Sequence, residues 1–230
     1  MSLFHHAVTC ELWDVVLQSS NKACDSAANT PITGLRSELL FCDMFNISII
    51  LNTVSKEVFG IFRDTSLGIL DLRTSECVSQ ASEIIAKLFK LKKLHVWGTF
   101  MSRCVFQLPS SLQDISLQNV DCSSERLCSL LITLSSCGHP VTCALMNVVF
   151  QSSNNPFGEA LETQASDLRS ELISCDMSDI TVILKSVSFE IFEIFRDTSI
   201  GILELRTSEC ASQASGIIAT LWKLKTLHVW

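Results

Sequence analysis

The sequence has little glycine or proline and no tyrosine. Its 230 residues include 8 glycines and 4 prolines, which argues against a disordered linker or a turn-rich β-sandwich. It also lacks a block of basic residues, since 17 Lys and Arg stand against 24 Asp and Glu and the net charge is −7. Binding to phosphates needs clustered Lys or Arg. Nucleic acid is therefore not an expected partner.

Long apolar runs are missing as well. No stretch approaches the roughly 18 consecutive apolar residues that a membrane span requires. The N-terminus, MSLFHHAVTC, has no basic start followed by a long apolar segment, as a secretory signal would. We therefore expect no membrane association and a cytoplasmic location.

The sequence contains no motif of a known catalytic type. It has no G-x-S-x-G, no P-loop, no HExxH and no Gly-rich dinucleotide turn. Eight glycines in the whole chain leave little material for a phosphate-binding loop. We expect a protein that is not an enzyme, with no cofactor, no metal and no small-molecule ligand.

Cysteine is abundant in comparison. The chain has eleven cysteines, with no C-x-x-C and no Cys/His spacing typical of zinc ligands. The main interpretation is a set of reduced core thiols that act as small hydrophobic side chains; disulfides or a metal site are the alternatives. The cysteines with aliphatic neighbours at repeat positions are Cys10, Cys77, Cys122, Cys143, Cys175 and Cys210.

A tandem duplication dominates the sequence. RSELLFCDM at Arg36 returns as RSELISCDM at Arg169, and IFRDTSLGILDLRTSEC at Ile61 returns as IFRDTSIGILELRTSEC at Ile194. All such pairs share an offset of about 133 residues, and roughly three aligned positions in five are identical. We assign the first copy to residues 5–137 and a shorter second copy to residues 138–230.

A shorter repeat lies inside each copy. Leu67–Cys77 has the pattern L-x-x-L-x-L-x-x-S-x-C, and related L-x-L segments recur at about 27-residue intervals. Alternating apolar residues indicate strands with one buried face. The predicted strand cores are Cys10–Leu12, Ile47–Ile49, Leu70–Leu72, Leu94–Val96, Ile115–Leu117, Cys143–Leu145, Ile180–Val182, Leu203–Leu205 and Leu227–Val229.

Helical periodicity follows several of these strands. Apolar residues three and four apart predict helices over Ser55–Thr65, Ser79–Leu91 and Ser124–Ser135, with Ser79 as an N-cap. A strand-turn-helix unit cannot bury its apolar face alone. We therefore expect the units to stack, with the strands in one parallel sheet and the helices in an outer layer.

The turn after each strand departs from a regular repeat. The position three residues after each predicted strand core should favour Asn or Cys, whose side chains satisfy turn backbone groups. Only Asn52 fulfils this expectation. We therefore expect an irregular polar ladder, that is, an irregular series of the polar side chains that stabilise the turns after the strands.

With its short repeats, the chain resembles the leucine-rich repeat superfamily. The residues that carry the resemblance are Leu67, Leu70, Leu72, Cys77, Leu91, Leu94, Val96, Leu112, Ile115, Leu117 and Cys122. The resemblance implies an α/β solenoid, a curved horseshoe arc with a parallel sheet on its concave face and helices on its convex face. Residues 1–230 would form a single leucine-rich repeat array.

The repeat length and the use of cysteine are most similar to the ribonuclease-inhibitor-like repeats at the C-terminus of NOD-like (NACHT) receptors. This likeness implies a non-catalytic module for protein–protein interaction, the ligand-sensing or autoinhibitory region of an innate immune receptor. Two alternatives are a substrate-recognition array of a ubiquitin-ligase adaptor and a structural array with no fixed ligand. Because polar capping repeats are missing, we interpret the chain as a fragment or an incomplete product.

A protein partner would bind the concave face, where side chains alternate with the buried L-x-L residues. Trp and Arg are favoured types for recognition of proteins. An equally weighted alternative is that the arginines pair with neighbouring acids and the tryptophans cover a loop. The predicted partner-binding residues are Asp71, Arg73, His95, Trp97, Glu204, Arg206, His228, Trp230, Glu11 and Trp13.

Overall fold

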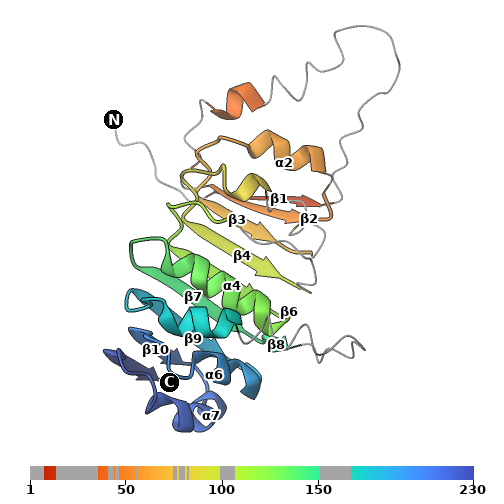
Figure 1. Cartoon of the computed structure of the whole chain (residues 1–230). Helices are drawn as coiled ribbons and strands as arrows, with labels where there is room; N and C mark the ends of the chain where they lie inside the picture. The colour runs from red at the N-terminus through yellow and green to blue at the C-terminus, as the bar shows by residue number, and fades with distance from the viewer. Residues whose placement is uncertain are drawn as a thin grey trace, which may run out of the picture. The chain divides into compact units, whose positions relative to one another are not determined.

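The part of the chain that the structure describes is an α/β structure with nine strands in one parallel sheet (Figure 1). The computed structural model describes residues 8–13, 36–40, 44, 47–54, 56–74, 77, 81, 83–98, 107–150 and 167–230. The strand order is β1-β2-β3-β4-β5-β7-β9-β10-β11, which follows the sequence. An α/β chain with a parallel sheet, as predicted from the sequence, is therefore confirmed.

The strands of this sheet are β1 (Val8–Trp13), β2 (Ile47–Asn52), β3 (Ile69–Leu72), β4 (Lys93–Trp97), β5 (Asp114–Gln118), β7 (Val141–Met146), β9 (Ile180–Lys185), β10 (Ile202–Leu205) and β11 (Thr226–Val229). A separate two-stranded parallel sheet pairs β6 (Asp121–Cys122) with β8 (Val149–Phe150). The named helices are α2 (Lys56–Phe62), α4 (Ser124–Ser135), α6 (Phe189–Phe195) and α7 (Ser208–Ile218).

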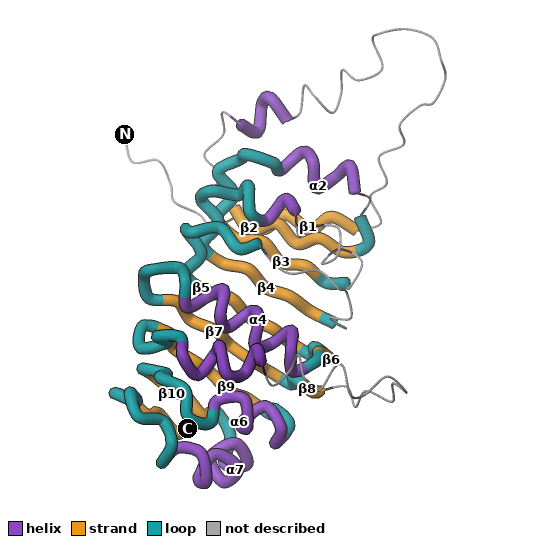
Figure 2. The backbone as a smooth tube through the Cα atoms, viewed as in Figure 1, coloured by secondary structure: helices purple, strands orange, loops and turns teal. Residues whose placement is uncertain are grey.

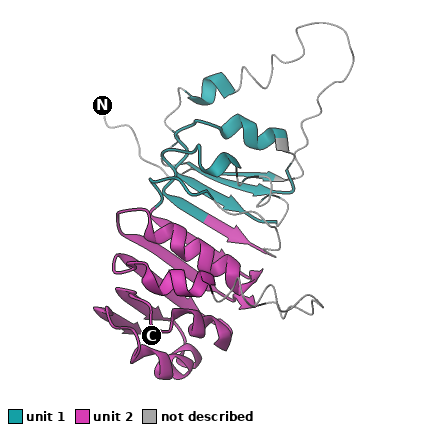
Figure 3. Cartoon of the chain, in the orientation of Figure 1, with its two compact units in different colours: residues 1–94, 106–112 teal, residues 95–105, 113–230 magenta. Residues whose placement is uncertain are grey.

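The chain divides into two compact units (Figure 3). Unit 1 consists of residues 1–94 and 106–112, and unit 2 consists of residues 95–105 and 113–230. The division falls within β4, and so it does not coincide with the end of the first repeat copy at residue 137.

Unit 1 contains three parallel strands and helix α2. β1 pairs with β2, and β2 pairs with β3. The side chains of Val58, Phe59 and Phe62 on α2 are buried, as the spacing of its apolar residues predicted. The largest fully buried side chains include Leu51, Phe59, Leu67, Leu72, Ile85, Leu88 and Leu91 of this unit.

Unit 2 contains five consecutive strands with helices on one side. β5 pairs with β7, β7 with β9, β9 with β10 and β10 with β11, all in parallel. Helices α4, α6 and α7 lie on one side of these strands (Figure 2). Their buried residues, such as Leu131, Phe192 and Cys210, face the core between the two layers.

The register corrects two of the predicted strand cores. Ile49 pairs with Leu70 and Leu51 with Leu72, while Val182 pairs with Leu203. The cores equivalent to Leu70–Leu72 and Leu203–Leu205 are therefore 49–51 and 182–184, two residues later than predicted. Both six-residue strands are apolar over most of their length, so alternation alone does not select the correct pair. A shift of two residues leaves each side chain on the predicted face.

Each strand of the β2, β5, β7 and β9 group ends in the same turn. The first residue after the strand is left-handed, with φ near +50° at Thr53, Asn119, Asn147 and Ser186. The next residue is a buried valine in every case; these residues are Val54, Val120, Val148 and Val187. With the corrected register of β2 and β9, this valine lies three residues after each strand core, where Asn or Cys was expected, and Asn52 no longer occupies that position. The irregular polar ladder therefore arises because an apolar residue fills this position.

The helix prediction is confirmed for α4, and helix α7 begins at a threonine cap that has a counterpart in the first copy. Helix α4 spans the predicted residues Ser124–Ser135. The N-cap of α7 is Thr207, whose hydroxyl accepts a hydrogen bond from the Cys210 N–H at 3.2 Å. Thr74 accepts from Cys77 in the same way in the first copy. In the first copy the capping hydrogen bond is therefore made by Thr74, five residues before the predicted cap Ser79, which lies outside the described residues.

Two buried serines fix the chain before β3 and β10. In unit 2, Ser199 accepts a hydrogen bond from the Met177 N–H at 2.8 Å and donates to the Cys175 carbonyl at 2.8 Å. In unit 1, Ser66 accepts from the Met44 N–H at 2.9 Å. Next to Ser199, a Cβ at Gly201 would overlap the carbonyl oxygen of Ser178, so only glycine fits there.

Candidate functional site

The strands of unit 2 have one covered face and one face open to solvent. The side chains of β9 and β10 that point to the helices are buried, as in β10, where Leu203 and Leu205 have exposed fractions of 3% and 0%. The side chains that alternate with them in β9 and β10 are half-buried or exposed. We call this second face of β9, β10 and β11, together with the residues directly after β10 and β11, the open face; its residues are Thr181, Ile183, Lys185, Ile202, Glu204, Arg206, Thr226, His228 and Trp230.

The four predicted residues of the second copy come together on the open face. Glu204 pairs in register with His228, and Arg206 Nη2 donates to Glu204 Oε2 at 3.1 Å. The rings of His228 and Trp230 stack, with centroids 6.3 Å apart and an angle of 22° between the planes. Trp230 is 74% exposed. The surface therefore combines a paired charge with a stacked, solvent-exposed indole.

Arg206 and Trp230 are held by the backbone as well. Both follow the last residue of their strands, and their N–H groups continue the sheet ladder, from Arg206 to the Leu184 carbonyl at 2.9 Å and from Trp230 to the Leu205 carbonyl at 3.0 Å. The two side chains are thus presented from adjacent strands in the same row.

The corresponding residues of the first copy lie in different units. In unit 1, Arg73 forms a bidentate pair with Asp71, with Nε to Oδ1 at 3.0 Å and Nη2 to Oδ2 at 3.1 Å. Asp71 is buried, with an exposed fraction of 7%. His95 and Trp97 belong to unit 2 and are half-buried. Both arginines therefore pair with an acid two residues before them, which is the alternative considered from the sequence.

The remaining two predicted residues lie on β1. Glu11 is exposed. The backbone of Trp13 is part of the strand, but its side chain lies outside the described residues.

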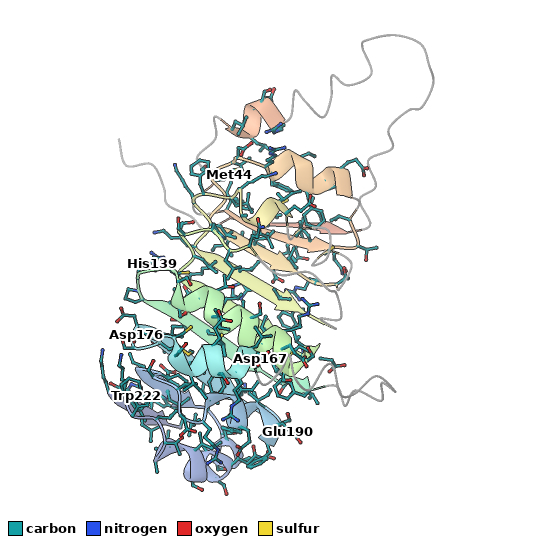
Figure 4. The ribbon with its side chains drawn as sticks, viewed as in Figure 1. Met44, His139, Asp167, Asp176, Glu190 and Trp222 are labelled. Atoms are coloured by element: carbon teal, nitrogen blue, oxygen red, sulfur yellow. The ribbon has the colours of Figure 1, made fainter. Side chains whose placement is uncertain are left out.

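A small polar cavity opens where the strands of unit 2 begin, and the sequence did not predict it. Its volume is about 170 Å³, and it is lined by Leu134, Ser135, Gly138, His139, Asp176, Ser178, Asp179 and Ile180. His139 precedes β7 and Asp176 precedes β9, and both lie along this edge (Figure 4). Because these residues come from separate repeats, no local motif could reveal the cavity.

Asp176 carries a stable negative charge at this edge. The pKa of its carboxyl group is lowered to about 2, chiefly because the Ser178 N–H donates to it, at 3.0 Å, and also because Lys223 pairs with its other oxygen. The ammonium group of Lys223 also lies over the Trp222 ring, 4.8 Å from the centroid. Trp222 is 65% exposed.

An aromatic residue followed by lysine recurs at this point in both copies. Phe89 and Lys90 occupy the positions of Trp222 and Lys223, with Phe89 57% exposed and the Lys90 ammonium 6.0 Å from its ring centroid. Alignment of the two copies could have revealed this pair, because an exposed aromatic residue is retained at the same repeat position.

The cysteines differ in their exposure. Cys77, Cys122, Cys143 and Cys210 are buried as predicted, whereas Cys10 is exposed and Cys175 is half-buried. Cys10 lies on β1, the first strand in the sheet order. All cysteines that the structure describes are free.

Burial keeps several of these thiols protonated. Burial raises the pKa of Cys143 to about 12, and burial together with the nearby Asp121 raises that of Cys122 to about 12. Burial also raises the pKa of Cys128 to about 11. A thiol with such a pKa is a poor nucleophile at neutral pH.

No group of three or more His, Cys, Asp or Glu among the described residues could hold a metal ion. No helix in the same part of the chain is long and apolar enough to cross a membrane.

Comparison of the chain with family models, curated proteins and solved structures gives no match.

Proposed function

We propose that the chain is a non-catalytic module for protein–protein interaction, and that the open face of unit 2 binds the partner. The observation that carries the proposal is the exposed row formed by Arg206 and Trp230 beside the Glu204–Arg206 pair. Trp and Arg contribute a large share of the binding energy at protein interfaces. A strand face holds them on a rigid support, so little side-chain entropy is lost on binding.

The composition of the face fits a protein partner. Ile183 and Ile202 are half-buried and supply apolar contact area between the charged groups. Protein interfaces commonly combine an apolar centre with a polar and charged rim. A partner with an acidic group near an apolar side chain would complement Arg206 and the two isoleucines.

The resemblance of the short repeats to leucine-rich repeats extends the proposal. By this resemblance, the chain acts in the cytoplasm as the ligand-sensing or autoinhibitory repeat region of a NOD-like receptor. The curved arc of such repeats, with the strands on its inner side, would place the open face toward the partner.

The test is recovery of partners by the immobilised chain and by a double variant, Ile183→Asp with Arg206→Glu. Both changes lie on the open face and reverse its apolar and charged character. Loss of hot-spot contacts should lower the recovery of a specific partner on the order of tenfold or more.

The matched control is Phe189→Asp with Arg196→Glu, which makes the same chemical changes on α6 in the helix layer. Phe189 is 51% exposed, and Arg196 pairs with Glu193 at 2.8 Å near the surface. The control should recover the partner as the wild-type chain does. Equal recovery by the open-face variant and the wild-type chain would overturn the proposal.

A further inference from the structure

The polar cavity of unit 2 lies between two adjacent repeats, away from both ends of the strand order. Its lining residues come from the end of α4, the turn before β7 and the segment that leads into β9. β7 pairs directly with β9, and the order continues to β5 on one side and to β10 on the other. The lining residues and the residues of the open face are different, so the cavity is a separate feature of this unit.

Two carboxylates line the cavity, and both belong to exposed residues. Asp176 already holds one ammonium group, that of Lys223, with Nζ to Oδ2 at 3.0 Å. None of the ion pairs within the described part of the chain involves Asp179. The main-chain carbonyl of Asp179 accepts from the Val141 N–H at 3.2 Å, which fixes the backbone at this position. The Asp179 carboxylate can therefore take up a further cation.

The C-terminal end of α4 adds partial negative charge to the same cavity. A helix carries partial negative charge at its C-terminus, which favours cations there. Leu134 and Ser135 are the last two residues of α4, and its last turn contains no basic residue. The Ser135 hydroxyl donates to the Ile132 carbonyl at 2.8 Å, so its oxygen can still accept a hydrogen bond.

Part of the lining is apolar, and it sets the size of a suitable ligand. Leu134 and Ile180 are 1% and 2% exposed, so they form the inner wall of the cavity. The cavity volume of about 170 Å³ is slightly larger than the roughly 150 Å³ of a cavity that accepts benzene. There is thus room for about six non-hydrogen atoms, such as an ammonium group on a chain of about five carbons.

Neither a metal ion nor an anion suits this lining. Among the residues that the structure describes, no group of three or more His, Cys, Asp or Glu could hold a metal ion. An anion would be repelled by the two carboxylates. A primary ammonium group has three N–H donors and no acceptor, so it matches the oxygen atoms of Asp179 and Ser135.

We propose that this cavity binds a primary ammonium group on a short aliphatic chain, with the ammonium at Asp179 and the chain against Leu134 and Ile180. This chemistry is shared by a free alkylamine and by the lysine side chain of a partner. The net charge of −7 favours the approach of a cation to the chain. Because no residue of the open face takes part, this site and the proposed function can fail independently.

The first copy supplies the substitutions that test the site. Asp179 corresponds to Asn46 and Ser178 corresponds to Phe45, so the sequence carries a neutral residue and a bulky residue at these two positions. The carboxylate proposed to bind the ammonium group is therefore specific to the second copy. Changing each residue to its counterpart removes either the charge or the free volume.

The test is an NMR titration of the isotope-labelled chain with n-pentylammonium chloride at neutral pH. The backbone amide signals of Gly138, Ser178 and Asp179 should shift and saturate with a Kd on the order of 1 mM, an affinity suited to a ligand of about six non-hydrogen atoms. n-Pentanol, which has the same chain without the charge, should bind on the order of tenfold more weakly.

Three variants show which lining groups are responsible. Asp179→Asn should lower the affinity on the order of tenfold, because the charge-assisted hydrogen bond is lost. Ser178→Phe keeps both carboxylates but occupies the free volume, and it should also weaken binding. The matched control is Glu209→Gln, a neutralised exposed acid on α7 that does not line the cavity, which should bind as the wild-type chain does. Thermal melts by circular dichroism check that each variant is folded.

A second titration distinguishes the two sources of the ammonium group. If N-acetyl-lysine amide binds with a similar affinity and N-acetyl-norleucine amide does not, the cavity accepts a lysine side chain. If only n-pentylammonium binds, the ligand is a small free amine. Equal binding of n-pentylammonium and n-pentanol would overturn the proposal, as would unchanged affinity in Asp179→Asn or shifts confined to amides outside the cavity.

Discussion

Asn147 donates its side-chain amide to the Oδ1 of Asn119 at 2.8 Å. Both residues have φ of 51° and directly follow neighbouring strands, β7 and β5. Their backbone N–H groups reach across to the next strand, from Asn119 to the Met146 carbonyl and from Asn147 to the Lys185 carbonyl, each at 2.9 Å. The two turns are thus joined by side chain and backbone, and asparagine suits them because it tolerates the left-handed conformation.

Replacing Asn147 by alanine should destabilise the chain by about 1 kcal/mol, because the hydrogen bond is lost and a Cβ-bearing residue without a polar group must hold a positive φ. Asn147→Gly should cost less, since glycine adopts this conformation freely. Urea denaturation of both variants checks the prediction. An alanine variant as stable as the wild-type chain would contradict it.

Leu72 and Asp71 test the strand register in unit 1. Leu72 is 0% exposed, and Leu72→Ala should cost about 2–5 kcal/mol as a core truncation. Asp71 is 7% exposed and bonds to Arg73 at the sheet surface, so Asp71→Ala should cost about 1 kcal/mol. Urea midpoints measure both variants. If Asp71→Ala were the more costly change, the assignment of the two faces would be wrong.

Ser199 should contribute more to stability than an exposed serine of the same unit. Ser199→Ala leaves the Met177 N–H without its buried acceptor, at a cost of about 1–3 kcal/mol. Ser66→Ala should lower the stability of unit 1 in the same way, because it removes the acceptor of the Met44 N–H. The control is Ser215→Ala on the exposed side of α7, which should be close to neutral. Thermal melts compare the three, and equal melting temperatures would refute the role of the buried hydroxyls.

Stability should fall in alkaline solution because of the buried thiols. The pKa of Cys143 is about 12 in the folded chain, against an ordinary value of 9.0. Below pH 9 both the folded and the unfolded chain hold this proton, so the contribution is fully present. Between pH 9 and 12 the unfolded chain releases the proton first, and the folded state loses stability as the pH rises.

Urea denaturation at pH 8 and pH 10 measures this effect, with Cys143→Ala as the comparison. The variant is expected to be less stable at pH 8, because it removes a buried group, but its stability should fall less between the two pH values. An identical fall in the wild-type chain and the variant would show that Cys143 does not cause it.

Most of the strand positions could be predicted from the sequence, because L-x-L alternation around Leu72, Leu117 and Leu205 leaves one choice of buried face. The cores of β2 and β9 were placed two residues too early because these strands contain additional apolar residues, and pairing with β3 and β10 decides the register. The prediction of helix α4 was correct because its apolar stripe and its flanking serines indicate the same bounds. The pairing of β6 with β8 was not predicted, since two residues carry no detectable pattern.

The open face could be predicted in part. The sequence identified Arg206, His228 and Trp230 because they alternate with buried residues. It did not decide whether Arg206 would pair with Glu204, since a surface ion pair depends on side-chain geometry. The cavity near His139 and Asp176 was missed because three-dimensional stacking alone brings the starts of different repeats together.

Identical sequences in unequal surroundings have an evolutionary consequence. Leu94 and Leu227 arose from one ancestral residue, yet the first is enclosed and the second is partly in contact with water. Purifying selection for folding should act strongly on Leu94 and only weakly on Leu227.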